Sequence, residues 1–547
     1  MKNIKNIKKY AILVVIGLLC GFIYYYITLP AINIHSQGFW SFCLTVLGII
    51  LVLYILRRMY KDPNVRIEDV NPIYQFKQSF FVKIMVATIG LLVLVFCAGS
   101  ILSSPLINAQ KYQALMTIEE REFTEDIVEV DYSTIPLLDR DSAALLGDRM
   151  MGSLVDLVSQ FEVSSDYAQI NYQGTPVRVT PLEYASPIKW LTNQRDGIPA
   201  YILIDMATQD TECVRLEEGI LYSKSEYFNR NIYRHLRFAY PTYIFDDQIF
   251  FEIDDDGVPY WVCPVKQFNV GLFGGQTVGS VVLCNAITGE TIEYAVEEVP
   301  EWVDKVYSAE LLTQLYDYSG TLKHGYLNSV LSQKDCLITT NGYNYITLNN
   351  DVWVYTGVTS VSGDQSNVGF VLMNQRTMET RFYTVAGAIE DSAMESAEGQ
   401  VQNLQYDATF PLLLNISGEP TYFLALKDAG GLVKMYAMVN VEKYQWVAIG
   451  STVAECESEY GKLLETNGIS SQENGESVTI SGSITAMSAV VIDGTTHFYL
   501  CIGEEMEIYD ILITQEELLS IITYDVGDSI TITYEEGNGL HTVIAIQ

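Results

Sequence analysis

Three long apolar stretches near the beginning of the chain constrain its fold more than any other feature. They cover residues 10–29, 39–56 and 84–104, and none of the three contains Asp, Glu, Lys, Arg or His. Each has about the length that an α-helix needs to cross the hydrocarbon core of a bilayer. The sequence therefore predicts three transmembrane helices, which form a membrane anchor over residues 1–104.

The charges around these stretches predict their orientation. Residues 1–104 hold ten Lys and Arg, of which four lie before residue 10 and six between residues 57 and 83, whereas the connection 30–38 holds none. Loops rich in Lys and Arg remain in the cytoplasm. We therefore expect the N-terminus and the 57–83 loop to be cytoplasmic and residues 105–547 to be extracytoplasmic. The stretches contain no Asp, Glu, Lys, Arg or His, and their absence disfavours a transporter that acts alone.

The rest of the chain is strongly acidic. The first 104 residues account for ten of the 32 Lys and Arg and for three of the 67 Asp and Glu. The remaining 22 basic and 64 acidic residues give residues 105–547 a net charge of −42. This asymmetry indicates that the two parts lie in different compartments.

A Gly-x-Pro-x-aromatic pattern followed by a β-rich run occurs three times beyond the anchor. The copies start at Gly197, Gly257 and Gly418. Gly supplies the positive φ of a turn, and Pro is tolerated at the first residue of a strand. A helical pattern precedes each copy, over residues 141–161, 225–240 and 391–404. The pattern predicts an α+β repeat, in which a helix is followed by antiparallel strands.

This repeat divides the chain beyond the anchor into predicted domains. Residues 105–320 hold the first two units. Residues 321–466 hold the third unit together with additional β-rich material over residues 341–383. Before the second predicted helix, Ser223 and Glu226 have the spacing of a capping box.

The middle copy ends in a turn that reads Asn285-Ala286-Ile287-Thr288-Gly289-Glu290. A helix, a Gly-x-Pro-x-aromatic strand and this turn together resemble PepSY-type extracytoplasmic modules, whose signature has Asp where this chain has Asn285. The turn of the first copy starts at Asp205 and lacks the Gly, and that of the third starts at Asn440 and lacks both Thr and Gly. PepSY modules are thought to bind or restrain partners, including peptidases, at the cell envelope. The whole chain is also similar to uncharacterised three-span membrane proteins of Gram-positive, clostridia-type bacteria, a resemblance that implies no known activity.

A polar linker over residues 467–476 precedes the last predicted domain, residues 477–547. About five strands and one helical stretch follow in an order that resembles an OB-type small β-barrel. OB folds often bind single-stranded nucleic acid through basic grooves and aromatic platforms. Residues 476–547, however, hold twelve Asp and Glu and no Lys or Arg, so they would repel a polyanion. We therefore expect no nucleic-acid partner, and the resemblance concerns the fold alone.

Arg230, Arg234 and Arg237, together with His235, form a basic face on the predicted helix 225–240, within an acidic domain. One interpretation is a binding site for a carboxylate, such as the C-terminus of a peptide or the acidic patch of a partner. The other is a set of surface arginines that pair with nearby Asp and Glu, and this second interpretation is favoured.

Other motifs give no catalytic, metal or cofactor site. The five His are scattered, and neither a GxSxG elbow nor cysteines at zinc spacing occur. The run from Asp254 to Gly257 favours a hairpin turn over a calcium loop, and the Gly271–Gly275 run is interpreted as a flexible loop tip. Cys263 and Cys284 lie in strands that can be neighbours; isolated thiols are favoured over a bridge.

These features predict a membrane-anchored α+β protein with a non-enzymatic role in binding, scaffolding or regulation at a bacterial cell envelope. The expected partners are the cytoplasmic membrane and an envelope protein, either a peptidase or a transporter. Two alternatives remain open. One is an accessory subunit of a transport or secretion complex, and the other is an envelope hydrolase or maturation factor.

Overall fold

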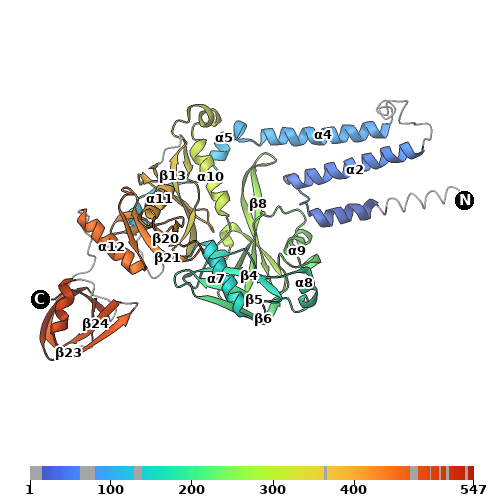
Figure 1. Ribbon diagram of the computed structural model, residues 1–547. Helices are drawn as coiled ribbons and strands as arrows, with labels where there is room; N and C mark the ends of the chain where they lie inside the picture. Colours follow the sequence, from blue (N-terminus) through green and yellow to red (C-terminus); the bar gives the residue numbers. More distant parts are fainter. Residues whose placement is uncertain are drawn as a thin grey trace. The chain divides into compact units, whose positions relative to one another are not determined.

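A computed structural model describes the protein over residues 15, 17–61, 80–127, 138–361, 366–467, 478–492, 495–503, 507–512, 516–535 and 540–546. The described residues form a mixed α+β protein whose sheets are mainly antiparallel (Figure 1). They fall into two compact units, residues 1–463 and residues 464–547. Most of the predicted linker 467–476 lies outside the described residues.

Two helices are long and apolar enough to cross a membrane. They lie in α2 (Gln37–Lys61) and α4 (Phe80–Leu102), where the apolar segments span 21 and 23 residues, and they run side by side (Figure 1). Few of their residues are buried, as expected of helices that do not pack in a protein core. The first predicted span begins outside the described residues, and a shorter apolar helix, Gly17–Thr28, is described there.

A helix associated with a four-stranded antiparallel meander recurs four times in the described part of the larger unit. The helices are α7 (Arg140–Ser153), α9 (Ile232–Ala239), α10 (Ala309–Thr321) and α11 (Glu390–Gln400). The first two meanders are β3 to β6 (Ala168–Tyr172, Thr175–Tyr184, Ile198–Asp205, Thr211–Ile220) and β7 to β10 (Phe250–Ile253, Pro259–Val270, Gly274–Asn285, Thr291–Ala295). The others are β12, β13, β15 and β16 (Asn344–Leu348, Asp351–Ser360, Gly369–Asn374, Thr380–Tyr383), and β19 to β22 (Leu412–Ile416, Glu419–Lys427, Val433–Asn440, Val447–Gly450).

The last hairpin of the first three units is closed by the same turn. The side-chain oxygens of Asp205, Asn285 and Asn374 each accept hydrogen bonds from the backbone N–H groups two and three residues further on, at 2.8–3.0 Å. A Thr then accepts from the residue two positions later at 3.2–3.3 Å. These Asx turns end the third strand of each meander and start the fourth.

The third unit explains the material over residues 341–383. The sequence predicts only an addition between repeats there, whereas the structure pairs these strands with α10 as a complete unit. Its first hairpin turns at Asn349 and Asn350, with φ of 52° and 66°. Because Asn tolerates positive φ, this unit needs no Gly-x-Pro, and a search for that pattern misses it. The predicted boundary at residues 320 and 321 falls inside the unit.

Two predicted helices are shorter than expected. The first ends at Ser153, and Phe161 begins strand β2 (Phe161–Val163) instead. The second divides into a 3₁₀ turn, η2 (Phe228–Arg230), and α9, whose N-terminus is capped by Asn231. The Ser223 hydroxyl accepts a hydrogen bond from the Glu226 backbone N–H at 3.2 Å, as in the predicted capping box, but this contact lies in a turn before the helix and does not cap it.

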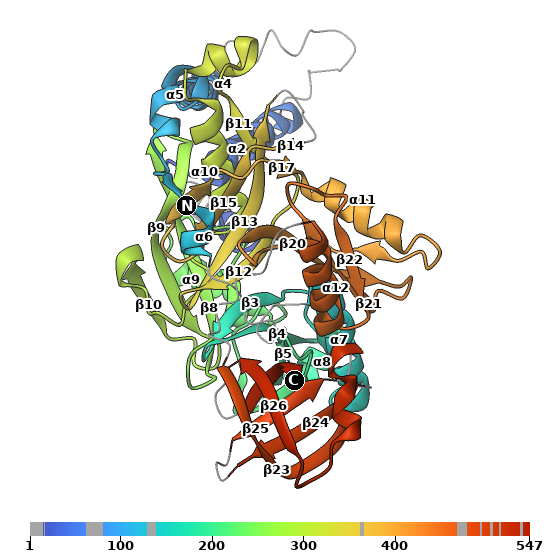
Figure 2. The same ribbon diagram turned by 90° about the vertical axis from the view of Figure 1, so that its left-hand side faces the viewer.

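The C-terminal unit contains a closed five-stranded barrel (Figure 2). Its strands pair around the barrel in the order β23 (Val478–Ile492), β24 (Thr495–Ile502), β25 (Ile508–Leu512), β27 (Leu540–Ile546), β26 (Ser529–Glu535). The pairing of β25 with β27 is parallel, and the others are antiparallel. A 3₁₀ segment, η5 (Glu516–Thr523), lies between β25 and β26 in the sequence. Buried aliphatic residues such as Leu500, Ile511 and Ile532 fill the barrel.

Candidate anion-binding cavity

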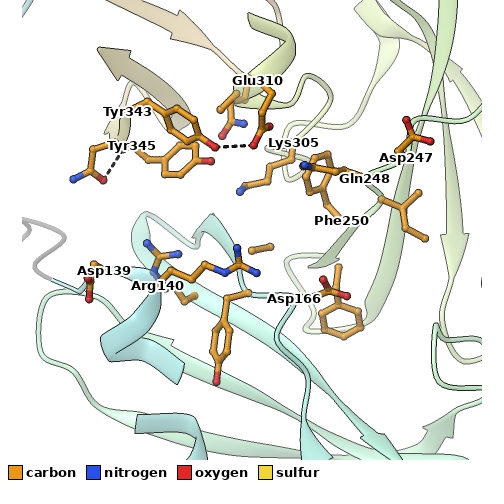
Figure 3. Close-up of a pocket in the computed structure, with 18 of the residues that line it drawn as sticks. Asp139, Arg140, Asp166, Asp247, Gln248, Phe250, Lys305, Glu310, Tyr343 and Tyr345 are labelled. Carbon is orange, nitrogen blue, oxygen red and sulfur yellow. Dashed lines mark hydrogen bonds between the residues drawn. The ribbon is translucent and has the colours of Figure 1, made fainter. Parts of the chain in front are cut away.

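A cavity of about 510 Å³ lies where the four helix–meander units meet (Figure 3). Arg140 and Arg178 come from the first unit and Phe250 from the second. The third unit contributes Tyr345, and Phe410 precedes the first strand of the fourth meander. Lys305 comes from the segment between the second and third units. The cavity therefore depends on the assembly of the whole repeat array.

The segment that carries Lys305 is fixed by a buried carboxylate. Glu252, on β7, is fully buried and accepts hydrogen bonds from the backbone N–H groups of Asp304 (2.9 Å) and Lys305 (3.0 Å). The Asp304 side chain in turn accepts from the backbone N–H of Asn171 on β3, at 2.6 Å. These contacts join the first two units and set the direction in which the Lys305 side chain leaves the backbone.

Lys305 is a buried residue, 5% exposed. Its Nζ lies over the rings of Tyr345 and Phe250, at 4.7 Å and 5.5 Å from their centroids. Within the residues that the structure describes, Nζ has no hydrogen-bond or ion-pair partner. Burial, followed by the positive charge of Arg178, lowers the pKa of Lys305 to about 8. Figure 3 shows Lys305 reaching into the cavity from one side and Arg140 from the other.

Two arginines add further donors. Arg178 is buried and donates from Nε to the carbonyl oxygen of Leu138 at 3.1 Å, while burial lowers its pKa to about 10. Arg140 donates from Nη2 to the carbonyl oxygen of Ser165 at 2.7 Å. Each guanidinium carries five N–H donors, so both retain unused donors beside the cavity.

The acidic residues of the lining are already engaged. Asp166 pairs with Lys224 at 2.7 Å, Asp139 with Lys427 at 2.6 Å and Asp247 with Lys266 at 2.9 Å. Glu310 accepts a hydrogen bond from the Tyr343 hydroxyl at 2.8 Å. Each acidic side chain of the lining thus has a cationic or hydroxyl partner, whereas Lys305 Nζ has none and both arginines keep unused donors, an arrangement that suits an anion.

Glu252 and Asp304 form a buried acidic pair behind this lining. Burial raises the pKa of both carboxyl groups, and the charge of Glu252 raises that of Asp304 further. Neither residue belongs to the cavity lining. Their hydrogen bonds with backbone N–H groups give them a structural role in holding Lys305.

The arginines predicted as a binding site lie elsewhere, beside the end of the first apolar helix. Arg237 donates to the carbonyl oxygens of Leu29 (2.9 Å) and Tyr243 (2.5 Å). Arg234 lies 4.9 Å over the ring of Tyr26, and Arg230 donates to the carbonyl oxygen of Gln194.

These contacts correct two expectations. Among the described residues none of the three arginines forms an ion pair with Asp or Glu, and Arg230 lies outside α9. The carbonyl groups at a helix C-terminus lack partners within the helix and attract cations. Arg237 supplies such a partner to Leu29. Carboxylate binding by the three arginines stays a prediction.

The Gly271–Gly275 run packs against the apolar helices. The backbone N–H groups of Leu272 and Phe273 donate to the Ser103 hydroxyl oxygen at 2.8 Å and 3.1 Å, and the ring of Phe273 lies 5.1 Å from that of Phe96. The interpretation as a flexible loop tip is therefore wrong. The apolar Leu-Phe pair within the glycines was the signal that pointed to packing.

Two further motifs, the cysteine pair and the Asp254–Gly257 turn, are as predicted. Cys263 and Cys284 are buried free thiols on neighbouring strands. Asp254 accepts from the backbone N–H groups of Asp256 and Val258, and Gly257 has a φ of 77°, as in a hairpin turn. No three His, Cys, Asp or Glu side chains converge on a metal-sized site within the described ranges.

Comparisons with known proteins add little to this description. No protein-family model matches the chain, and no curated protein matches it. One solved structure, the crystal structure of an ACO/RPE65 chimera in a monoclinic form, aligns at 9% identity with a TM-score of 0.14. The alignment covers 72% of this chain and 66% of that one, just under two thirds. A similarity this weak gives no information about the fold or the activity of this protein.

Proposed function

We propose that this protein is a membrane-anchored, extracytoplasmic binding protein of a bacterial cell envelope, and that its cavity binds the carboxylate group of a peptide partner. The observation that carries the proposal is Lys305, a buried residue whose ammonium group faces a cavity and forms no hydrogen bond or ion pair with a described residue. The carboxyl groups of Glu252, Asp304 and Glu310 act on it only from a longer distance. A buried cation without a partner is costly. A bound carboxylate removes that cost and gains charge-assisted hydrogen bonds.

The shape of the cavity favours a peptide end over a small inorganic anion. A volume of about 510 Å³ is within the range of sites for small organic ligands. Phe250, Tyr345 and Phe410 supply aromatic wall area beside the cations. A C-terminal residue with an apolar side chain matches both features, because its carboxylate meets the cations and its side chain meets the rings.

Two features of the fold support the wider assignment. Four helix–meander units, three of them closed by the same Asx turn, agree with PepSY-like modules, which are associated with partner binding at the envelope. The five-stranded barrel with one 3₁₀ segment agrees with an OB-like domain. The two long apolar helices and the uncharged connection 30–38 support an anchor with residues 105–547 outside the cytoplasm.

A protease experiment tests the orientation. Protease added to intact protoplasts should cleave within residues 105–547 and leave an N-terminal tag intact. Protection of the ectodomain in intact protoplasts, with cleavage only after lysis, would contradict the proposed topology.

In-cell crosslinking tests the binding role. A photoreactive residue in place of Tyr343, which lines the cavity, should capture a peptide or the end of an envelope protein, identified by mass spectrometry. The same replacement at Val155, an exposed residue of the first unit away from the cavity lining, serves as the control. Identical products from both positions would contradict binding in the cavity.

A hydrolase is the second candidate, because Glu252 and Asp304 are close carboxyl groups whose pKa values are raised by burial. Neither faces the cavity, which is why binding is preferred. Hydrolysis of peptides by the purified protein, abolished by Glu252→Gln with the fold retained, would favour the hydrolase.

A further inference from the structure

Three strongly exposed apolar side chains lie on two neighbouring short elements of the first two units. Ile188 and Leu191 belong to α8 (Pro187–Asn193) and are 72% and 61% exposed, and Phe228 in η2 is 64% exposed. An open groove runs between these elements and is lined by both Leu191 and Phe228. Exposed apolar side chains that cluster in this way mark an interaction surface.

This face is held rigidly. The ring of Trp190 lies 4.7 Å from that of Tyr227, and its Nε1 donates to Glu226 at 2.7 Å. Glu226 also accepts from the Tyr184 hydroxyl at 2.7 Å. Phe228 itself has a φ of 52°, a left-handed conformation that is costly for an aromatic residue. A fixed scaffold and a strained backbone therefore keep the Phe228 ring exposed.

The same face continues to the first apolar helix. The ring of Phe238 on α9 lies 5.9 Å from Tyr26 and 6.1 Å from Tyr25, near the C-terminal end of the helix Gly17–Thr28. The Tyr26 hydroxyl is 3.5 Å from the Asn229 side chain, which is the neighbour of Phe228. The exposed apolar groups thus begin where this helix would leave a membrane, at the level where Tyr side chains prefer to lie.

Basic residues accompany the apolar ones. Arg195 lines the groove and is exposed, and Lys189 lies on α8 between Ile188 and Leu191. Apolar side chains flanked by Lys and Arg are typical of segments that lie in the interface of a bilayer. Their positive charge complements that of anionic lipid headgroups, which attract Lys and Arg near the membrane surface.

We propose that α8 and η2 form a lipid-docking face, which places Ile188, Leu191 and Phe228 in the outer interface of the membrane that the apolar helices cross. Lys189 and Arg195 then meet lipid phosphates. The occupant is the lipid of the protein's own membrane, because the face is continuous with the end of an apolar helix. The proposal rests on the proposed membrane anchoring and is independent of peptide binding in the cavity.

Photocrosslinking to lipid tests this face in the full chain. The protein is placed in nanodiscs of phosphatidylcholine, with and without phosphatidylglycerol, and benzoylphenylalanine replaces one residue at a time. The replacement Phe228→benzoylphenylalanine should give a lipid adduct by mass spectrometry. Leu94 in α4 is the positive control for anchoring, and Val155, which is 85% exposed, is the negative control.

The outcomes separate the two proposals. Lipid adducts at Leu94 but none at Phe228 would overturn the docking face alone, whereas adducts at neither position would overturn the anchoring on which it rests. Equal adducts at Phe228 and Val155 would also overturn docking. Phosphatidylglycerol should raise the adduct yield at Phe228 several-fold, and Lys189→Ser with Arg195→Ser should remove that increase. An increase that survives both substitutions would overturn the assigned role of the two cations.

Discussion

The acidic ectodomain contains two groups of cations that differ in what surrounds them. Arg230, Arg234 and Arg237 donate to backbone carbonyl groups or lie over a tyrosine ring, and Arg237 joins α9 to the end of the first apolar helix. Lys305 and Arg178 are more deeply buried, yet they face a cavity with unused donors. The three arginines that cluster in the sequence therefore form structural contacts. The candidate binding site is formed instead by Lys305 and Arg178, which retain unused hydrogen-bond donors.

The largest expected difference between the two groups concerns ligand binding. Lys305→Met should weaken the binding of a tripeptide that ends in phenylalanine by about 30-fold or more, because loss of a buried charge contact costs about 2–5 kcal/mol. Arg237→Met is the matched control and should leave the affinity unchanged. Calorimetry on the full chain in detergent measures both. An equal loss of affinity in both variants would show that Lys305 and Arg237 do not differ in their role in ligand binding.

For stability, the Arg237 substitution should be more damaging than the Lys305 substitution. Arg237→Met leaves the carbonyl oxygens of Leu29 and Tyr243 without this donor and should lower the free energy of unfolding by about 2–3 kcal/mol. Denaturant unfolding followed by tryptophan fluorescence provides the measurement. A substitution without effect would show that the contact between α9 and the apolar helix contributes nothing to stability.

Lys305→Met should instead raise the free energy of unfolding at pH 7, because burial, followed by the charge of Arg178, lowers the pKa of Lys305 from 10.5 to about 8. The folded protein then binds fewer protons than the unfolded chain between these values. Wild-type stability should therefore rise as pH increases from about 8 towards 10.5. The same unfolding experiment at several pH values gives the test, and a fall over this interval in the wild type relative to the variant would contradict it.

Peptide binding should have the opposite pH dependence. As pH rises above about 8, Lys305 loses its charge in the free protein, and affinity for the tripeptide should decrease. The Lys305→Met variant should lack this decrease. A fall in affinity of equal size in the variant would assign the effect to another group.

The smallest expected effect concerns the contact between Ser103, which follows α4, and the Gly271–Gly275 turn. Ser103→Ala removes the acceptor for the N–H groups of Leu272 and Phe273 and should cost about 1 kcal/mol of stability. Hydrogen exchange of these two amides should accelerate in the variant. Unchanged exchange would mean that apolar packing alone holds the turn.

The sequence predicted the α+β class and the apolar helices because both depend on local patterns. Periodicity located α7 and α11, and glycines located the turns at Gly257 and Gly418. The third unit was missed because Asn349 and Asn350 replace Gly-x-Pro, although the Asn374-x-x-Thr377 turn carried the signal.

The cavity was not predictable in this way. Arg178, Lys305 and Tyr345 are far apart in the chain and meet only after the four units have packed together. Lys305 is flanked in sequence by ordinary acidic and apolar residues, and nothing local shows that it is buried without a partner. The sequence therefore directed attention to three neighbouring arginines on the surface.

A thermodynamic cycle tests carboxylate binding by Lys305 most directly. The affinities of wild type and Lys305→Met are measured for two tripeptides that differ only in a free or amidated C-terminus. Amidation should weaken binding strongly in the wild type and little in the variant, with a coupling free energy of about 2 kcal/mol or more. Equal effects of amidation in both proteins would contradict the assignment of Lys305 as the group that binds a carboxylate.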